Sequence, residues 1–222
     1  MSMTRVAAVV ALAALLLVAG TKWDLPLNTT TGLTAHDVAV SVATHQGRRA
    51  VKLLWQPGSG YSYALLPGET LEDGTVEVDV AGQPATGAGE GARGFVGLAF
   101  RVRPDGSAFE CFYLRPTNGR ADDQLRRNHS TQYISKPNFP WERLRREAPG
   151  VYESYVDLQP GVWTHMKIEF VGKRAALYVN GADQPSLNVN DLKLAPAAGG
   201  LALWVGDGTE AYFRNLKVST AR

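Results

Sequence analysis

The sequence predicts an all-β fold, an antiparallel sandwich of two sheets, and three observations support this prediction. Almost every apolar stretch after Thr21 has the length and the two-residue alternation of a β-strand. Glycine and proline, 23 and 12 of the 222 residues, separate these stretches at short intervals, as turns do. No segment before the centre of the chain keeps a 3.6-residue apolar period over the length of a helix. Many short strands joined by frequent turns are typical of a two-sheet sandwich.

The chain begins with a short basic segment that is followed by an apolar run over residues 6–20. This run is shorter than the ~20 residues that a membrane-spanning helix needs, and it is typical of a secretory signal peptide. We therefore expect a signal peptide at residues 1–20, one mature domain at residues 21–222, and a secreted or periplasmic protein with no stable membrane insertion after cleavage. A buried helix or an uncleaved anchor is the alternative interpretation of the same run.

The first clear strand pattern of the mature chain is GTVEVDVAG, at residues 74–82. Its three valines alternate with Glu77 and Asp79, which gives the strand one apolar face and one acidic face. Two denser runs follow, RGFVGLAFRV at residues 93–102 and AFECFYLRP at residues 108–116. Because these runs are apolar at consecutive positions, we expect strands that are covered on both faces.

The C-terminal third adds four more strand patterns. VWTHMKIEF at residues 162–170 alternates strictly, and a short turn joins it to AALYVNG at residues 175–181. This arrangement predicts a β-hairpin. GGLALWVG at residues 199–206 and AYFRNLKV at residues 211–218 predict the last two strands, on either side of a Gly-Asp-Gly turn.

The middle of the chain departs from this pattern. Residues 115–147 show no strand alternation and carry eight Lys/Arg against four Asp/Glu, although the whole chain has a formal net charge of only +2. Their aromatic and aliphatic content argues against disorder. Residues 140–148 fit a short helix that begins at a proline. We therefore expect an ordered insertion that lies across one sheet.

Composition excludes several functional classes. The small net charge gives no reason to expect a nucleic-acid partner. Cys111 is the single cysteine, which excludes an internal disulfide and any multi-cysteine metal site. The sequence has no His-x-His or His-x-x-x-His pair, so it assigns no metal ligands, and it leaves the cofactor unknown.

Two C-terminal segments, GVWTHMKIEFVGKRAALYVNG and GGLALWVGDGTEAYFRNLKV, resemble the concanavalin A-like lectin/glucanase superfamily. The similarity is closer to the secreted bacterial 3-keto-disaccharide hydrolase domain, also described as a 3-keto-glucoside lyase and hydratase. The matching features are Trp163-Thr164 at the start of one strand, Tyr178-Val179-Asn180-Gly181 at the end of the next, and Phe213-Arg214-Asn215 in the last. The resemblance covers about residues 161–218 and implies a jelly-roll sandwich that acts on glycans.

Glycosidases of this superfamily carry carboxylates along one strand in the pattern Glu-x-Asp-x-x-Glu. Glu77 and Asp79 match the first two positions, but Gly82 stands where the second glutamate belongs. Retaining cleavage needs two carboxyl groups about 5–5.5 Å apart. Ordinary retaining hydrolysis by this strand is therefore disfavoured.

The segment VYESYVDL offers a better surface for a sugar. A period of two would place Glu153, Tyr155 and Asp157 on one face. The tyrosine could then stack on a pyranose ring while the carboxylates accept its hydroxyl protons. An outer strand face with one exposed aromatic side chain is the alternative.

The insertion supplies further candidates for a site. His129 can exchange a proton near neutral pH. Trp141 is either a sugar platform or the anchor that packs the insertion onto the sheet. Side chains that can donate or accept hydrogen bonds to sugar hydroxyls are Arg126, Arg127, Gln132 and Tyr133. The alternative is a structural loop in which the arginines pair with nearby acidic residues.

Two functions fit these residues, and a third is weaker. The resemblance implies an enzyme that cleaves a 3-keto glycoside, by base-assisted elimination or hydrolysis, because a ketone at C3 acidifies the proton at C2. The base would be His129 or Glu153, with Arg126 and Arg127 as donors to the enolate or to hydroxyl groups, and with Tyr155 and Trp141 as platforms. A non-catalytic, lectin-like module with a carbohydrate ligand is the second interpretation. A sandwich that binds a protein partner through its insertion is the third.

Overall fold

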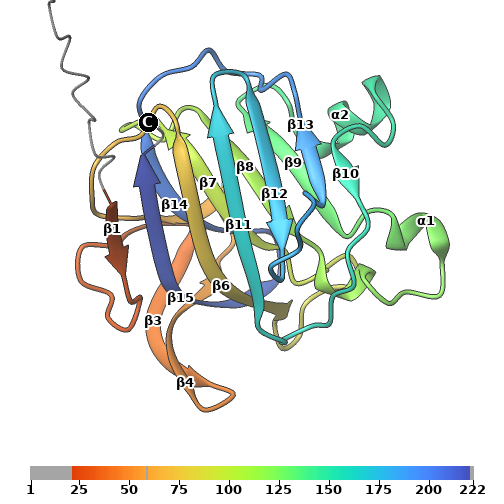
Figure 1. The fold of residues 1–222 in the computed structure, drawn as a ribbon. Helices are drawn as coiled ribbons and strands as arrows, with labels where there is room; N and C mark the ends of the chain where they lie inside the picture. The colour runs from red at the N-terminus through yellow and green to blue at the C-terminus, as the bar shows by residue number, and fades with distance from the viewer. Residues whose placement is uncertain (1–21, 59, 221–222) are drawn as a thin grey trace, which may run out of the picture.

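The computed structural model describes residues 22–58 and 60–220, which form two antiparallel sheets packed face to face (Figure 1). The predicted all-β jelly-roll sandwich is thus confirmed. The expected signal peptide at residues 1–20 lies outside the described residues. In the part of the chain that is described, no helix has the length and apolar character needed to cross a membrane.

The first sheet contains eight strands in the order β13-β12-β11-β6-β15-β4-β3, and β1 pairs with β15 beside this path. Its strands are β1 (Lys22–Leu25), β3 (Val38–His45), β4 (Arg48–Trp55), β6 (Gly74–Pro84), β11 (Thr164–Val171), β12 (Arg174–Val179), β13 (Leu187–Val189) and β15 (Thr209–Thr220). The expected hairpin is present, because β11 and β12 pair in register from Met166 opposite Val179 to Val171 opposite Arg174.

The second sheet contains seven strands in the order β10-β9-β8-β7-β14-β5-β2. Its strands are β2 (Thr34–His36), β5 (Ser62–Leu65), β7 (Val96–Val102), β8 (Phe109–Leu114), β9 (Thr131–Lys136), β10 (Glu153–Ser154) and β14 (Gly200–Val205). Both dense apolar runs are strands of this sheet, and every residue of β7 and β8 is buried. The expectation that these two strands are covered on both faces is confirmed.

The core lies between the two sheets. In β6 the three valines are buried while Glu77 and Asp79 face outward, as the alternation predicts. Phe100 of β7 and Phe170 of β11 meet across the interface with ring centroids 4.6 Å apart. Such close aromatic contacts fix which face of each strand points inward.

The outer face of the second sheet is also covered. Tyr113 lies on that face of β8 beside Gly97 of β7 in the neighbouring register position. A Cβ atom at Gly97 would clash with the Phe112 carbonyl oxygen and with Tyr113. The glycine therefore leaves room for a large aromatic side chain on this face.

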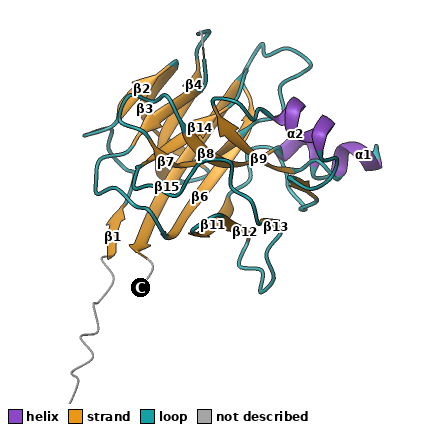
Figure 2. Ribbon diagram, turned by 90° about the horizontal axis from the view of Figure 1, so that it is seen from above, coloured by secondary structure: helices purple, strands orange, loops and turns teal. Residues whose placement is uncertain are grey.

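The middle of the chain differs from the prediction in one respect. Residues 115–147 are ordered, and the expected helix is present as α2 (Trp141–Glu147), next to a shorter helix α1 (Gln124–Arg127) and a 3-10 turn at Pro116–Asn118. They also contain β9, which pairs with β8 and is an integral strand of the sheet. Both faces of β9 are buried, so its sequence lacks the alternation on which the prediction relied. Figure 2 shows both helices at the same end of the sandwich, beside β9.

The segment VYESYVDL forms a much shorter strand than the sequence suggests. Only Glu153 and Ser154 pair with β9, and the backbone leaves the sheet after Ser154. The period of two therefore does not extend to Tyr155 and Asp157, and these side chains do not share a sheet face with Glu153.

The last two strands are present, but they do not pair with each other. β14 belongs to the second sheet and β15 to the first, so the Gly-Asp-Gly turn crosses from one sheet to the other. Gly208 has a φ of 64°, which glycine adopts without strain. The crossover closes the sandwich and sets Trp204 of β14 on the outer face of the second sheet, opposite Tyr63.

Candidate functional site

Two neighbouring pockets open on the outer side of the second sheet. The first, which we call the aromatic pocket, has a volume of about 370 Å³, and its aromatic lining residues are Tyr61, Phe95, Tyr113, Trp141 and Trp204. The second, which we call the charged pocket, has a volume of about 710 Å³ and includes Leu125, His129, Arg145, Glu153 and Tyr155. The α2 helix joins them, because Trp141 lines the first and Arg145 lines the second. The guanidinium of Arg145 lies 4.6 Å from the centre of the Trp141 ring.

The charged pocket is built around the carboxylate of Glu153, whose side chain is 3% exposed. His129 Nε2 lies 3.1 Å from Glu153 Oε1. Arg145 donates from Nε to both carboxylate oxygens at 3.1 Å and from Nη2 to Oε2 at 2.6 Å. Arg115 Nη1 lies 3.9 Å from Oε2. The carboxylate is therefore shared by one imidazole and two guanidinium groups.

Backbone contacts hold His129 in this position. The residue follows α1, whose start is capped by the Asp123 carboxylate, which accepts from the Arg126 backbone N–H at 2.6 Å. The His129 carbonyl oxygen accepts from Arg115 Nη1 at 3.3 Å and from Asn118 Nδ2 at 3.1 Å. His129 is thus fixed from both its backbone and its ring.

The pKa of His129 is lowered from its ordinary value of 6.5, mainly because the ring is withdrawn from water. Glu153 opposes this shift, whereas the positive charges of Arg145 and Arg115 add to it. The imidazole is accordingly neutral at pH 7. A neutral imidazole beside a carboxylate can accept a proton, which is the property of a general base.

A buried cation lies beneath the aromatic pocket. The side chain of Arg115 donates from Nη2 to the Tyr113 hydroxyl at 2.8 Å. Its guanidinium carbon lies 5.2 Å from the centre of the Tyr113 ring, 5.4 Å from that of Trp141 and 6.0 Å from that of Phe95. Arg115 therefore connects the two pockets from below, through Glu153 on one side and the aromatic rings on the other.

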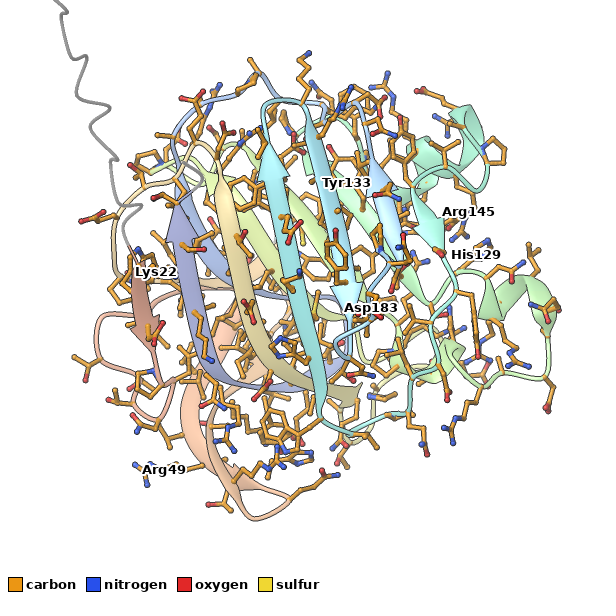
Figure 3. The ribbon with its side chains drawn as sticks, in the orientation of Figure 1. Lys22, Arg49, His129, Tyr133, Arg145 and Asp183 are labelled. Atoms are coloured by element: carbon orange, nitrogen blue, oxygen red, sulfur yellow. The ribbon has the colours of Figure 1, made fainter. Side chains whose placement is uncertain are left out.

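The structure brings five of the residues predicted from the sequence into this region. His129 and Glu153 are in contact, and Figure 3 shows His129 next to Arg145 at the edge of the sandwich. Trp141 and Tyr155 are exposed on the two pockets. Arg127 donates from Nη2 to the Tyr155 hydroxyl at 3.2 Å and holds that ring in place.

The other four predicted residues have structural contacts. Arg126 donates to the side chains of Asn118 and Thr117, behind the site. Asp157 forms an exposed ion pair with Arg120. The other two are buried in the second sheet: Gln132 is opposite Glu153 on the neighbouring strand and donates to the backbone, while Tyr133 points into the core.

We expect the buried hydroxyl of Tyr133 to stabilise the fold and not to contact a ligand. Its hydroxyl donates to Glu110 Oε2 at 2.6 Å, and Glu110 is fully buried. We expect Tyr133→Phe to lower the free energy of unfolding by about 1–3 kcal/mol, because the buried carboxylate loses a donor. Denaturant unfolding measures this change. The control is Tyr178→Phe, since its hydroxyl bonds to no described side chain. Equal stability of the two variants would contradict the prediction.

The sequence interpretation missed Arg115, Arg145 and most of the aromatic pocket. Arg115 and Tyr113 are two positions apart at the end of β8, which would have placed them on one face. Nothing in the sequence distinguishes Arg145 from its neighbours on α2. Tyr61, Phe95 and Trp204 come from three segments that only the sheet topology brings together.

The outer face of the first sheet carries a different cluster. Glu77 and Asp79 both contact His165, at 3.2 Å and 2.9 Å. A Cβ atom at Gly82 would clash with the Gly94 carbonyl oxygen, so no glutamate side chain fits at the third position of the glycosidase pattern. Within residues 22–58 and 60–220, no group of three His, Cys, Asp or Glu side chains is arranged to hold a metal ion.

Comparison with known proteins gives a family and a fold. The family model described as the 3-keto-alpha-glucoside-1,2-lyase-like domain matches residues 52–219, which include the middle segment and both pockets. No curated protein matches the sequence.

Several solved structures share the architecture. The carbohydrate-binding module CBM66 from Bacillus subtilis has 18% identity and a TM-score of 0.55, over 84% of this chain and 95% of that one. A Bacillus subtilis protein of unknown function with a galectin-like fold has 11% identity and a TM-score of 0.62, over 92% and 98%. A glycosyl hydrolase candidate from Parabacteroides distasonis has 13% identity and a TM-score of 0.52, over 86% and 89%. At these identities the similarity shows the fold alone.

Proposed function

Because the chain belongs to the 3-keto-alpha-glucoside-1,2-lyase-like domain family, we propose that it is a secreted or periplasmic enzyme that cleaves 3-keto glycosides in the charged pocket. Secretion rests on the N-terminal sequence. A carbohydrate ligand is supported by the family and by the shared fold of a carbohydrate-binding module. The observation that carries the catalytic part is the contact between His129 and Glu153 next to Arg145.

His129 is the base in this proposal, and Glu153 positions it. His129 Nε2 lies 3.1 Å from Glu153 Oε1, and in this proposal the carboxylate favours the tautomer with its proton on Nε2, which leaves the lone pair on Nδ1. His129 lines the charged pocket, and its Nδ1 makes no hydrogen bond to any described residue. The two oxygens of Glu153 are already occupied by Arg145 and His129, so the carboxylate is less suited to take a proton itself.

The proposed reaction is an elimination that needs no oxidant or reductant. Nδ1 of His129 takes the C2 proton, and the electrons of the C2–H bond form an enolate with the C3 ketone. Arg145 lines the same pocket and supplies positive charge to stabilise the enolate oxygen. The enolate then re-forms the C3 ketone and a C1=C2 double bond, the C1–O bond breaks with its electron pair leaving on the alkoxide, and the alkoxide takes the proton that Nδ1 of His129 had received. Addition of water to the double bond, with hydroxide at C1 and a proton at C2, gives the free 3-keto sugar.

A product assay tests this function. The purified protein is incubated with a 3-keto disaccharide and, separately, with the unoxidised disaccharide, and released sugar is quantified. Release from the keto substrate alone is the expected result, because only the ketone acidifies C2. Binding of sugars without any cleavage would overturn the proposal and favour the lectin-like module. Absence of both binding and cleavage would favour a protein partner.

The pH dependence of this reaction follows from the lowered pKa of His129. A base must be unprotonated, so kcat/KM is lost as pH falls through the pKa of the imidazole. Since that pKa lies below 6.5, we expect more than half of the maximal kcat/KM to persist at pH 6.5. A pH profile of kcat/KM measures the midpoint of the acid limb. A midpoint above 6.5 would show that another group controls the reaction.

A further inference from the structure

The aromatic pocket differs chemically from the charged pocket and from an ordinary sugar subsite. Its floor is Tyr113, whose ring centroid lies 4.7 Å from that of Trp204 and 6.0 Å from that of Phe95. Tyr61 and Trp141 complete the lining from the loop before β5 and from α2. A sugar ring needs several hydrogen-bonding groups at its edge in addition to one or two stacking partners. Five aromatic rings around about 370 Å³ instead provide a large apolar surface.

The polar residues of this pocket indicate which charge its ligand carries. Besides the hydroxyl and indole N–H groups of the aromatic residues, it is lined by the polar side chains of Ser62, Glu142 and Asp207, and no Lys, Arg or His is among the described residues that line it. Two carboxylates disfavour an anionic ligand. A cationic ligand is also disfavoured, because the Arg115 guanidinium already lies against three of the rings from below. A neutral group with aromatic faces fits both constraints.

The two pockets lie next to each other along α2. Trp141 lines one pocket, Arg145 lines the other from one helical turn further along, and the Arg145 guanidinium lies 4.6 Å from the centre of the Trp141 ring. We infer that the aromatic pocket binds the aglycone of the substrate, and that this aglycone is a neutral aromatic group. This inference rests on the proposed function, since it assumes that the sugar ring occupies the charged pocket.

The chemistry of the leaving group agrees with an aryl substrate. When the C1–O bond breaks, its electron pair remains on the aglycone oxygen. A phenolic hydroxyl has a pKa of about 10, so an aryl oxide leaves more readily than an alkoxide and depends less on a proton donor. The enzyme would then need only the base and the positive charge already described.

Phenyl and methyl 3-keto-α-glucosides test this inference, because they share the sugar and differ only in the aglycone. With the full chain, we expect the phenyl compound to bind at least tenfold more tightly in calorimetry and to quench tryptophan fluorescence. The 4-carboxyphenyl analogue should bind more weakly than the phenyl compound, since it meets Glu142 and Asp207. Equal affinity for phenyl and methyl glycosides would overturn the inference.

A variant in the lining of the aromatic pocket provides the structural control. Gly60 lines this pocket, and a Cβ atom there would meet nothing within 4 Å. We expect Gly60→Leu to remove most of the phenyl preference while the kcat/KM for the methyl glycoside stays unchanged. If the leucine variant does not fold, Tyr61→Ala replaces it, because it removes one of the five aromatic rings that the phenyl group would contact. An equal loss for both glycosides would contradict the inference.

The two proposals can fail separately in this experiment. If the methyl glycoside is cleaved and the phenyl group adds nothing, the aglycone inference is wrong and the function stands. If phenyl α-glucoside, lacking the ketone, binds in the aromatic pocket but neither keto glycoside is cleaved, the proposed reaction is wrong and the preference for aromatic groups stands.

Discussion

Replacing His129 by glutamine is expected to reduce the turnover of a 3-keto glycoside by about 10²–10⁴-fold, the usual contribution of a general base. The glutamine amide nitrogen can take the place of Nε2, which lies 3.1 Å from Glu153 Oε1, and can donate a hydrogen bond to that carboxylate. What the variant lacks is a basic nitrogen in the position of Nδ1. Steady-state kinetics measure the loss, and thermal unfolding shows that the protein is folded.

The matched control is His165→Gln. His165 is also held by carboxylates, with Nδ1 2.9 Å from Asp79 and Nε2 3.2 Å from Glu77, but it lies on the outer face of the other sheet. We expect this variant to keep full turnover. If His129→Gln kept turnover within threefold of the native protein, or if both variants lost it equally, His129 could not be the base.

The fold class was predictable because the alternation of apolar and polar residues within a single strand can be read from the sequence. In β11, and in β6 as far as Val80, every second side chain is buried, and this alternation is visible in the sequence without knowledge of the partner strands. The turn after β12 can also be recognised from the sequence Asn180-Gly181. Both residues adopt a positive φ, of 54° and 71°. These two residue types tolerate that conformation better than others.

β9 could not be predicted in the same way. Tyr133 points into the core, while Gln132 and Ile134 are buried on the outer face by the segment that covers the sheet. A strand whose two faces are both covered needs no polar face, and its mixed polar and aromatic residues resemble those of a loop. Its position depends on pairing with β8, which is a tertiary property.

For the candidate site, the sequence could suggest the types of side chain but not how they are arranged. His129 could be chosen because it is the one histidine of residues 115–147, and Glu153 because the alternation of VYESYVDL grouped it with Tyr155 and Asp157. The register that sets Glu153 opposite Gln132 brings His129 and Glu153 together. Which arginines face Glu153 is decided by the direction of α2 and by the end of β8, so the choice of Arg126 over Arg145 had no basis in the sequence.

Glu153→Gln is the second change for which we expect a large effect. The amide has the shape of the carboxylate, but it can present either its oxygen or its NH2 group to Nε2 of His129. It therefore no longer favours the tautomer with the proton on Nε2, and part of the imidazole population presents a protonated Nδ1 to the substrate. We expect turnover to fall by about 10²-fold or more, as for a general base that has lost its orienting group. Steady-state kinetics on the 3-keto disaccharide measure this.

The pH profile distinguishes a positioning role for Glu153 from a merely structural one. The negative charge of Glu153 raises the pKa of His129 against the effect of burial and of the two arginines. Removing that charge should lower the pKa further, so the acid limb of the residual activity is expected to move to lower pH. A residue that only stabilised the fold would reduce the amount of active protein and leave the midpoint in place. An unmoved acid limb would therefore show that Glu153 does not act through His129, whatever the loss of turnover.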